Sequence, residues 1–121
     1  MEITKVNISH KLSSFCDYWS PKIVGELNGQ LVKVAKFKGD FVMHQHDNED
    51  ELFYVISGQL YIELKDKTLQ LKPGEFVIIP KGVFHKPYAP NEVHVLLFEP
   101  ESTLNTGNVN NDMTVSNLTT I

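Results

Sequence analysis

The sequence is short of the features that mark several large classes of protein. Cys16 is its only cysteine, so no disulfide can form within the chain, which fits a reducing compartment. No apolar run approaches the about 20 residues that a membrane helix needs, and the first residues lack the apolar stretch of a secretory signal. With a formal net charge of −4, the chain has no basic excess for binding phosphates. These absences predict a cytoplasmic protein that binds neither membranes nor nucleic acid.

What the sequence does contain is enough for one folded domain. Of its 121 residues, 41% are hydrophobic and 10% aromatic, which suits a single core. Turn residues separate short apolar or alternating runs about every 8–12 residues, and no long helical period occurs. This pattern predicts an all-β sandwich or barrel over residues 21–100. Residues 1–20 are predicted as an N-terminal segment. Residues 101–121 are predicted as a polar C-terminal extension, either lying over the barrel or partly mobile.

Three local signals place individual elements. Asn28-Gly29 predicts a hairpin, because a type I′ turn needs a positive φ at both central residues. The run Phe76–Ile79 is apolar throughout and predicts a strand buried on both faces. In the N-terminal segment, Ser9 is a candidate N-cap for a short helix through Phe15.

Three histidines and one glutamate recur in a pattern typical of a metal site. His44 and His46 are two residues apart, so on a strand their side chains point to the same face. Glu51 follows after a gap that fits a short loop, and His85 follows, after two intervening residues, a proline–glycine turn that can aim it inward. Three imidazoles and one carboxylate form a full ligand set for one divalent transition metal, such as Fe, Mn, Ni, Co or Zn.

The acidic run around Glu51 leaves a choice of carboxylate. Glu49 and Asp50 are competitors for the position of Glu51, because all three lie in the segment DNEDE. We interpret both, together with Asp47, as solvated residues at the mouth of the barrel.

Two segments around these residues resemble the two motifs of the cupin superfamily. In Gly39–Gly58, the HxH pair is followed by four residues, a glutamate, six residues and a glycine. In Gly74–His85, a glycine is followed by five residues, a PxG turn, two residues and a histidine. Two positions depart from the family pattern: the gap before His44 is one residue short, and Ala89 replaces an asparagine. Neither is a ligand, so the predicted metal site is unaffected.

The resemblance implies a small jelly-roll barrel, also called a double-stranded β-helix. Its size is similar to that of small single-domain bacterial cupins of the cupin type 2 kind, which are often described as mannose-6-phosphate-isomerase-like. It implies one divalent transition metal per chain, a small-molecule ligand or substrate, and a homodimer. The ligands it implies are His44, His46, Glu51 and His85.

The predicted site leaves the reaction open. Cupins include dioxygenases, isomerases or epimerases, and decarboxylases, and the four ligands do not distinguish these classes. Tyr61 and Tyr88 are candidate general acids. The alternatives to an enzyme are a non-catalytic module that binds or senses a small ligand, with the metal as an anchor, and a purely structural metal site.

Overall fold

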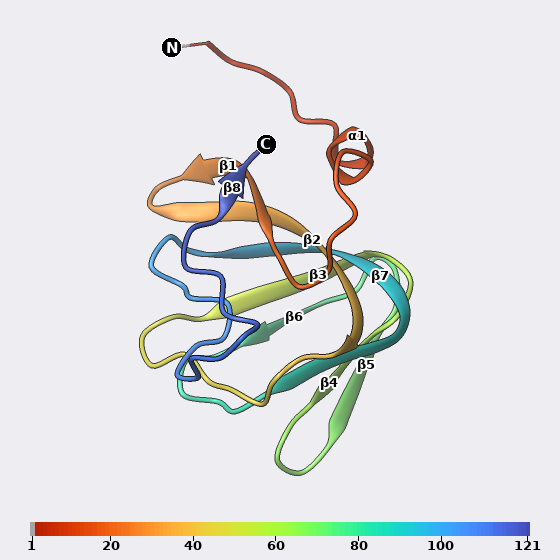
Figure 1. Cartoon of the computed structure of the whole chain (residues 1–121), viewed down its shortest axis with the longest axis vertical. Coiled ribbons are helices and arrows are strands. Elements are labelled where there is room, and N and C mark those ends of the chain that lie inside the picture. The colour runs from red at the N-terminus through yellow and green to blue at the C-terminus, as the bar shows by residue number, and fades with distance from the viewer. Residues whose placement is uncertain (1) are drawn as a thin grey trace.

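The computed structural model describes residues 2–121 and consists mainly of strands (Figure 1). One short helix, α1 (Ile8–Leu12), precedes them. The strands are β1 (Lys22–Leu27), β2 (Gln30–Asp40), β3 (Glu51–Ser57), β4 (Leu60–Glu63), β5 (Thr68–Leu71), β6 (Phe76–Ile79), β7 (Lys86–Pro100) and β8 (Thr119–Thr120). The all-β prediction is therefore confirmed.

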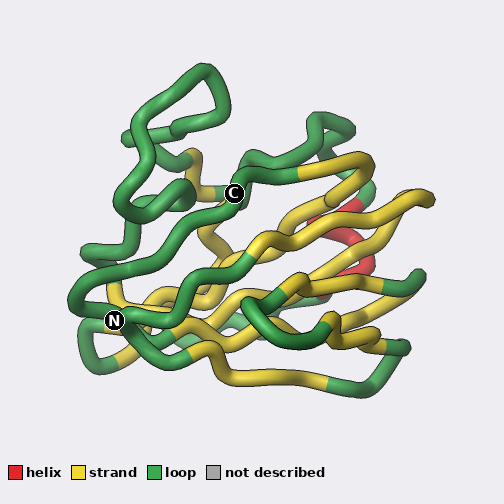
Figure 2. Tube along the Cα trace, turned by 90° about the horizontal axis from the view of Figure 1, so that it is seen from below, coloured by secondary structure: helices red, strands yellow, loops and turns green. Residues whose placement is uncertain are grey.

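The two longest strands, β2 and β7, form the frame of the barrel. They pair antiparallel along nearly their whole length, from Gln30 opposite Pro100 to Asp40 opposite Tyr88. The first part of β7 also pairs with β4, and its second part pairs with β3. Both strands curve as they run, so the strands form two layers around a common interior (Figures 1 and 2). The hydrogen-bonded ladder does not close into a ring, and the arrangement is the predicted jelly roll.

The interior of the barrel is one apolar cluster to which almost every strand contributes. Along β3, Phe53 and Val55 are buried, whereas Leu52 and Tyr54 are only half-buried. This alternation is what a strand with one inward face requires. The members of the cluster are Trp19, Ala35, Phe37, Phe41, Phe53, Val55, Leu60, Ile62, Leu71, Ile79, Ala89, Val93, Val95 and Leu97.

The N-terminal helix begins earlier and ends earlier than predicted. Asn7, and not Ser9, is the N-cap, because its side-chain oxygen accepts a hydrogen bond from the backbone N–H three residues later at 3.0 Å. The helix ends at Leu12, before Phe15, where the Ser13 hydroxyl donates to a carbonyl of the last turn. Such a bond competes with continued helix. Within residues 2–121, no helix has the length and apolar character needed to cross a membrane.

The prediction that β6 is buried on both faces is wrong. Ile79 faces the core, but Phe76 and Ile78 are 60% and 54% exposed. The reason is topological, because β6 pairs only with β3 and lies at the edge of the sheet. Within the described chain, no layer covers its outer face.

The C-terminal tail lies along the barrel (blue chain, Figure 1). Its last strand, β8, pairs in parallel with β1, with Lys22 opposite Thr119. Earlier in the tail, Met113 packs against the core cluster. The tail is therefore joined to the barrel by one strand pair and one apolar side chain.

Gly58, directly after β3, is a position where we predict a large loss of stability. Its φ is +82°, and a Cβ atom there would lie 2.6 Å from the carbonyl oxygen of Glu92. Gly58→Ala should therefore lower the free energy of unfolding by about 2–4 kcal/mol, through backbone strain plus overlap. Gly74→Ala is the matched control, because its φ is +87° with no atom within 4 Å, and it should cost about 1–2 kcal/mol. Equal losses in urea denaturation would contradict the close contact.

Candidate metal centre

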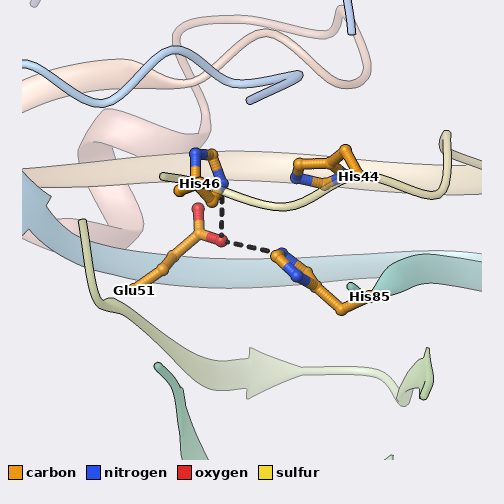
Figure 3. A group of neighbouring side chains, drawn as sticks. All are labelled: His44, His46, Glu51 and His85. Carbon is orange, nitrogen blue, oxygen red and sulfur yellow. Dashed lines mark hydrogen bonds and ion pairs between the residues drawn. The ribbon is translucent and has the colours of Figure 1, made fainter. Parts of the chain in front are cut away.

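His44, His46, Glu51 and His85 converge inside the barrel (Figure 3). One potential ligand atom from each lies within 4.8 Å of the others, and none of the four residues is more than 4% exposed. The Glu51 Oε1 atom lies 3.2 Å from His85 Nε2 and 3.4 Å from His46 Nε2. The structure therefore brings together all four residues that the sequence predicts as ligands.

Backbone hydrogen bonds between distant segments hold these side chains together. His44 and His85 form an isolated antiparallel bridge, with N–H to carbonyl distances of 3.0 and 2.8 Å. The N–H of Gly82, in the proline–glycine turn, donates to the carbonyl of His46 at 2.8 Å. Glu51 is the first residue of β3 and enters the interior from there. The turn before His85 is thus bonded directly to the segment that carries the other two histidines.

The hydrogen bonds of two rings fix which nitrogen carries the proton. His44 Nδ1 lies 2.9 Å from the carbonyl oxygen of Val42, and His85 Nδ1 lies 2.9 Å from that of Val83. Because a carbonyl oxygen only accepts, Nδ1 carries the proton and Nε2 of the neutral ring keeps a lone pair. A ligating histidine in proteins is commonly oriented in this way.

The convergence of lone pairs fits a bound cation. Nε2 of His85 lies 3.2 Å from a carboxylate oxygen of Glu51, a distance that a proton or a metal ion can bridge. Both ring nitrogens of His46 are buried and have no hydrogen-bond partner among residues 2–121. Acceptors that face one another in a buried space are unfavourable unless a proton or a metal ion lies between them. Imidazole nitrogens with one carboxylate suit a divalent transition metal.

The protonation of the cluster also suits ligation. Burial, reinforced by the neighbouring His85, lowers the pKa of His44 to about 4. Burial acts to raise the pKa of Glu51, but the adjacent imidazoles of His46 and His85 outweigh it and hold this pKa well below its ordinary range. At neutral pH, His44 is therefore neutral and Glu51 ionised, which are the forms that bind metals.

A buried ion pair lies next to the cluster. Lys33 Nζ is 2.6 Å from Glu99 Oε1, and both side chains are 2% exposed. Burial and the nearby Glu51 carboxylate raise the pKa of Glu99 well above its ordinary range. Glu99 Oε2 has no hydrogen-bond partner within the described chain. Glu99 lines the same small cavity as His44 and Glu51.

Sequence reasoning missed this pair. The available signal was strand phase, because Glu99 shares the inward phase of Val95 and Leu97, and Lys33 shares that of Ala35. A charged residue in the inward phase of a barrel strand is either paired or functional.

The competing carboxylates and the two tyrosines are not brought to the cluster. Asp50 accepts a hydrogen bond from the backbone N–H of Lys81, and Glu49 accepts one from the hydroxyl of Ser102. Both carboxylates therefore bind other parts of the barrel mouth.

Tyr61 and Tyr88 lie opposite each other on β4 and β7 and stack at 5.2 Å. Their neighbours Ile62 and Pro87 are buried, so by strand alternation the tyrosines face outward. The Tyr61 hydroxyl accepts a hydrogen bond from the exposed Gln70 side chain at 3.2 Å. The geometry gives neither tyrosine a role at the metal centre.

Comparison with known families and structures agrees with this geometry. The chain matches the family model for the cupin domain over residues 30–99. It is also similar to the crystal structure of a cupin-2 domain containing protein from Shewanella frigidimarina NCIMB 400. That match has a TM-score of 0.79 and 41% sequence identity, and covers 79% of this chain and 94% of that one.

Two curated proteins of Bacillus subtilis (strain 168) are similar over shorter stretches. Uncharacterized protein YdbB is 42% identical over 64 residues, which cover 52% of this chain and 57% of that protein. Quercetin 2,3-dioxygenase is 33% identical over 61 residues, which cover 48% of this chain but only 18% of that enzyme. The similarity to the dioxygenase therefore concerns a small part of the whole enzyme.

The lowered pKa of His44 predicts a pH-dependent stability of the metal-free protein. The unfolded chain binds a proton at His44 near pH 6.5, whereas the folded chain does so only near pH 4. Stability is therefore lost as pH falls through this window, by about 3 kcal/mol at most for this group. Urea denaturation in steps from pH 7.5 to 4 should show the loss, and His44→Gln should remove it.

Only the difference between these two proteins isolates His44. The raised pKa of Glu99 acts in the opposite sense, because the folded state then binds the extra proton and gains stability as pH falls. The same pH slope in the wild type and in His44→Gln would contradict the assignment.

Proposed function

Because this chain belongs to the cupin domain family, we propose that it is a divalent-metal-dependent enzyme acting on a small, oxygen-bearing molecule. The observation that supports this most is the convergence of three buried imidazoles and one buried carboxylate, in which both ring nitrogens of His46 lack a hydrogen-bond partner within the described chain. A site built only to tie strands together would not need a ligand cavity beside it. Here a small cavity of about 20 Å³ lies next to His44 and Glu51.

The proposed ligands are the four residues of the cluster. When bound, a divalent metal that takes five or six ligands supplies a Lewis acid with a position for an oxygen atom, as Fe, Mn, Co and Ni do more readily than Zn. Phe53 and Phe41 line the cavity beside this position and exclude bulk water. Glu99 offers an unpartnered oxygen to a hydroxyl group of the substrate.

Dioxygenation is the reaction to test first. The similarity to quercetin 2,3-dioxygenase supports it. Isomerisation or epimerisation and decarboxylation are the other reactions that such a site supports. We also propose that the protein is cytoplasmic. Its description as a mannose-6-phosphate-isomerase-like cupin remains a prediction from the sequence.

The first experiment measures metal content and oxygen use together. Protein purified without chelators is analysed for metals and then reloaded without oxygen using Fe(II), Mn(II), Co(II), Ni(II) or Zn(II). We expect about one metal ion per chain, and oxygen uptake with catechols or flavonols for at least one metal. Metal binding without turnover of any oxygenated substrate would favour the alternative, a non-catalytic binding or sensor module.

His46→Ala tests the ligand assignment. Loss of one of four ligands should weaken metal affinity by at least 100-fold, while the β fold stays largely intact because His46 is not part of the core cluster. Metal competition titrations measure the affinity, and far-UV circular dichroism measures the fold. His94→Ala is the matched control, since His94 bonds to Glu92 outside the cluster. Stoichiometric metal in His46→Ala would refute the assignment.

The proposed assembly is a homodimer formed through the outer face of β6 and β3. Phe76 and Ile78 are more than half exposed there, and the register places them beside Tyr54 and Leu52 on the same face. Monomers rarely leave such contiguous apolar patches in water. A second copy is the proposed occupant, because an uncharged apolar face is complementary to itself and two-fold pairing is the commonest symmetry.

Light scattering coupled to size exclusion tests the dimer. We expect twice the 13.8 kDa of one chain, and we expect Phe76→Glu with Ile78→Lys to yield monomers. Phe84→Glu is the control, because Phe84 is similarly exposed but belongs to the turn before His85. A wild-type mass of one chain would refute the homodimer.

A further inference from the structure

The tail residue Asn108 holds the peptide between two of the proposed ligands. Gln45 lies between His44 and His46, and its backbone N–H donates to Asn108 Oδ1 at 3.0 Å. In return, the backbone N–H of Asn108 donates to the carbonyl oxygen of Gln45 at 3.0 Å. One residue of the tail thus satisfies both backbone groups of the residue that sets the spacing of the histidine pair.

Gly107 brings the tail backbone into contact with a proposed ligand itself. Its φ is +56°, and a Cβ atom there would lie 2.2 Å from the carbonyl oxygen of Gln45 and 3.0 Å from His44 Cδ2. Real Cβ atoms do not approach this closely, so any side chain at this position must displace the histidine segment or the tail. The two backbones are packed against each other directly at the metal centre.

The tail is firmly folded where it makes these contacts. Thr106 is fully buried, and its hydroxyl is bonded to the Val109 carbonyl at 2.6 Å and the Thr114 hydroxyl at 2.7 Å. The side chain of Asn105 bonds to the backbone of Met113 and of the residue two positions later. Gly107 and Asn108 therefore belong to a hydrogen-bonded turn, which fixes their position relative to the histidine segment.

The same tail segment forms one wall of an opening that leads to His46. The opening is lined on one side by His46 and the loop Asp47–Glu49, and on the other by Ser102, Leu104, Gly107 and Asn108. The Ser102 hydroxyl bonds to Glu49 at 2.8 Å and links the two walls. A metal ion or small molecule that reaches the cluster by this route passes the tail.

We propose that the tail segment Ser102–Asn108 contributes directly to metal binding at this site. Asn108 and Gly107 are positioning residues: they fix the His44–His46 segment in its ligating position and close one side of the path to the ion. The inference rests on the proposed metal site. It adds that residues outside the family match, which ends at residue 99, determine how tightly and how long the ion is held.

The test compares metal affinity and metal release in tail variants of the full chain. Asn108→Ala removes the acceptor for the Gln45 N–H, so Co(II) and Zn(II) should bind at least tenfold more weakly and be removed faster by a chelator. Asn108→Asp keeps the acceptor oxygen and should restore wild-type values. Asn110→Ala is the neighbouring control, because Asn110 is exposed and its side chain makes no hydrogen bond within the described chain.

Gly107→Ala should have the larger effect, about 100-fold in affinity, with a changed visible absorption spectrum of bound Co(II). Gly74→Ala introduces a comparable backbone strain away from the site and should leave affinity and spectrum unchanged. Thermal unfolding of each metal-free variant separates lost folding from lost positioning.

Four outcomes decide the inference. Weaker binding in Asn108→Ala, rescued in Asn108→Asp, supports it. Wild-type metal binding in Asn108→Ala and Gly107→Ala overturns it and leaves the proposed metal site standing. A wild-type protein that takes up no Co(II) or Zn(II) overturns both, and equal losses in Asn108→Ala and Asn110→Ala overturn the role of Asn108 alone.

Discussion

The arrangement at the mouth of the barrel depends on one electrostatic constraint, the burial of four polar ligand groups close together. Three imidazole rings and one carboxylate come together in a buried site, where none of the four residues is more than 4% exposed. Each of these groups would form hydrogen bonds with water in the unfolded chain, so their burial is unfavourable unless a cation compensates it. The low pKa of His44 and the low pKa of Glu51 both follow from this arrangement. The cluster is poised for a metal ion and costs stability without one.

Such a cluster keeps its geometry only if the chain fixes each ring. The bridge between His44 and His85, the bonds of two Nδ1 atoms to carbonyls and the bond from Gly82 to His46 all serve this purpose. The Nδ1 bonds are local, to carbonyls two residues away, whereas the bridge and the Gly82 bond join segments far apart in sequence. The tail adds a further support at Gln45. Positioning of the ligands is therefore distributed over the whole mouth of the barrel.

The features that could be predicted from the sequence are those specified by a short local pattern or by a motif with fixed spacing. The Asn28-Gly29 turn has φ values of +52° and +77°, as its composition predicts, and the four proposed ligands have a spacing that specifies their convergence. The exposure of Phe76 was not predictable, because an apolar run does not reveal which strand becomes an edge. The Lys33–Glu99 pair depends on two strands that meet only in the folded barrel. The contact between Gly107 and Gln45 was also not predictable. Gly107 lies in the tail, whose sequence has no helical or strand periodicity from which its position could be inferred.

Trp19 of the N-terminal segment packs into the core beside the metal cluster. Trp19 adopts a φ of +58°, which is unfavourable for a bulky residue. Its stacking on Phe37 at 4.1 Å and on Phe41 at 4.8 Å, and its indole bond to a carbonyl, offset that strain. These rings fill space beside the cluster, so a ligand must be small or must extend toward the mouth, where the tail forms a wall. Trp19 and the tail both lie outside residues 30–99, over which the chain matches its family. The matched barrel thus contains the candidate metal site, and residues of both unmatched ends line the space beside it.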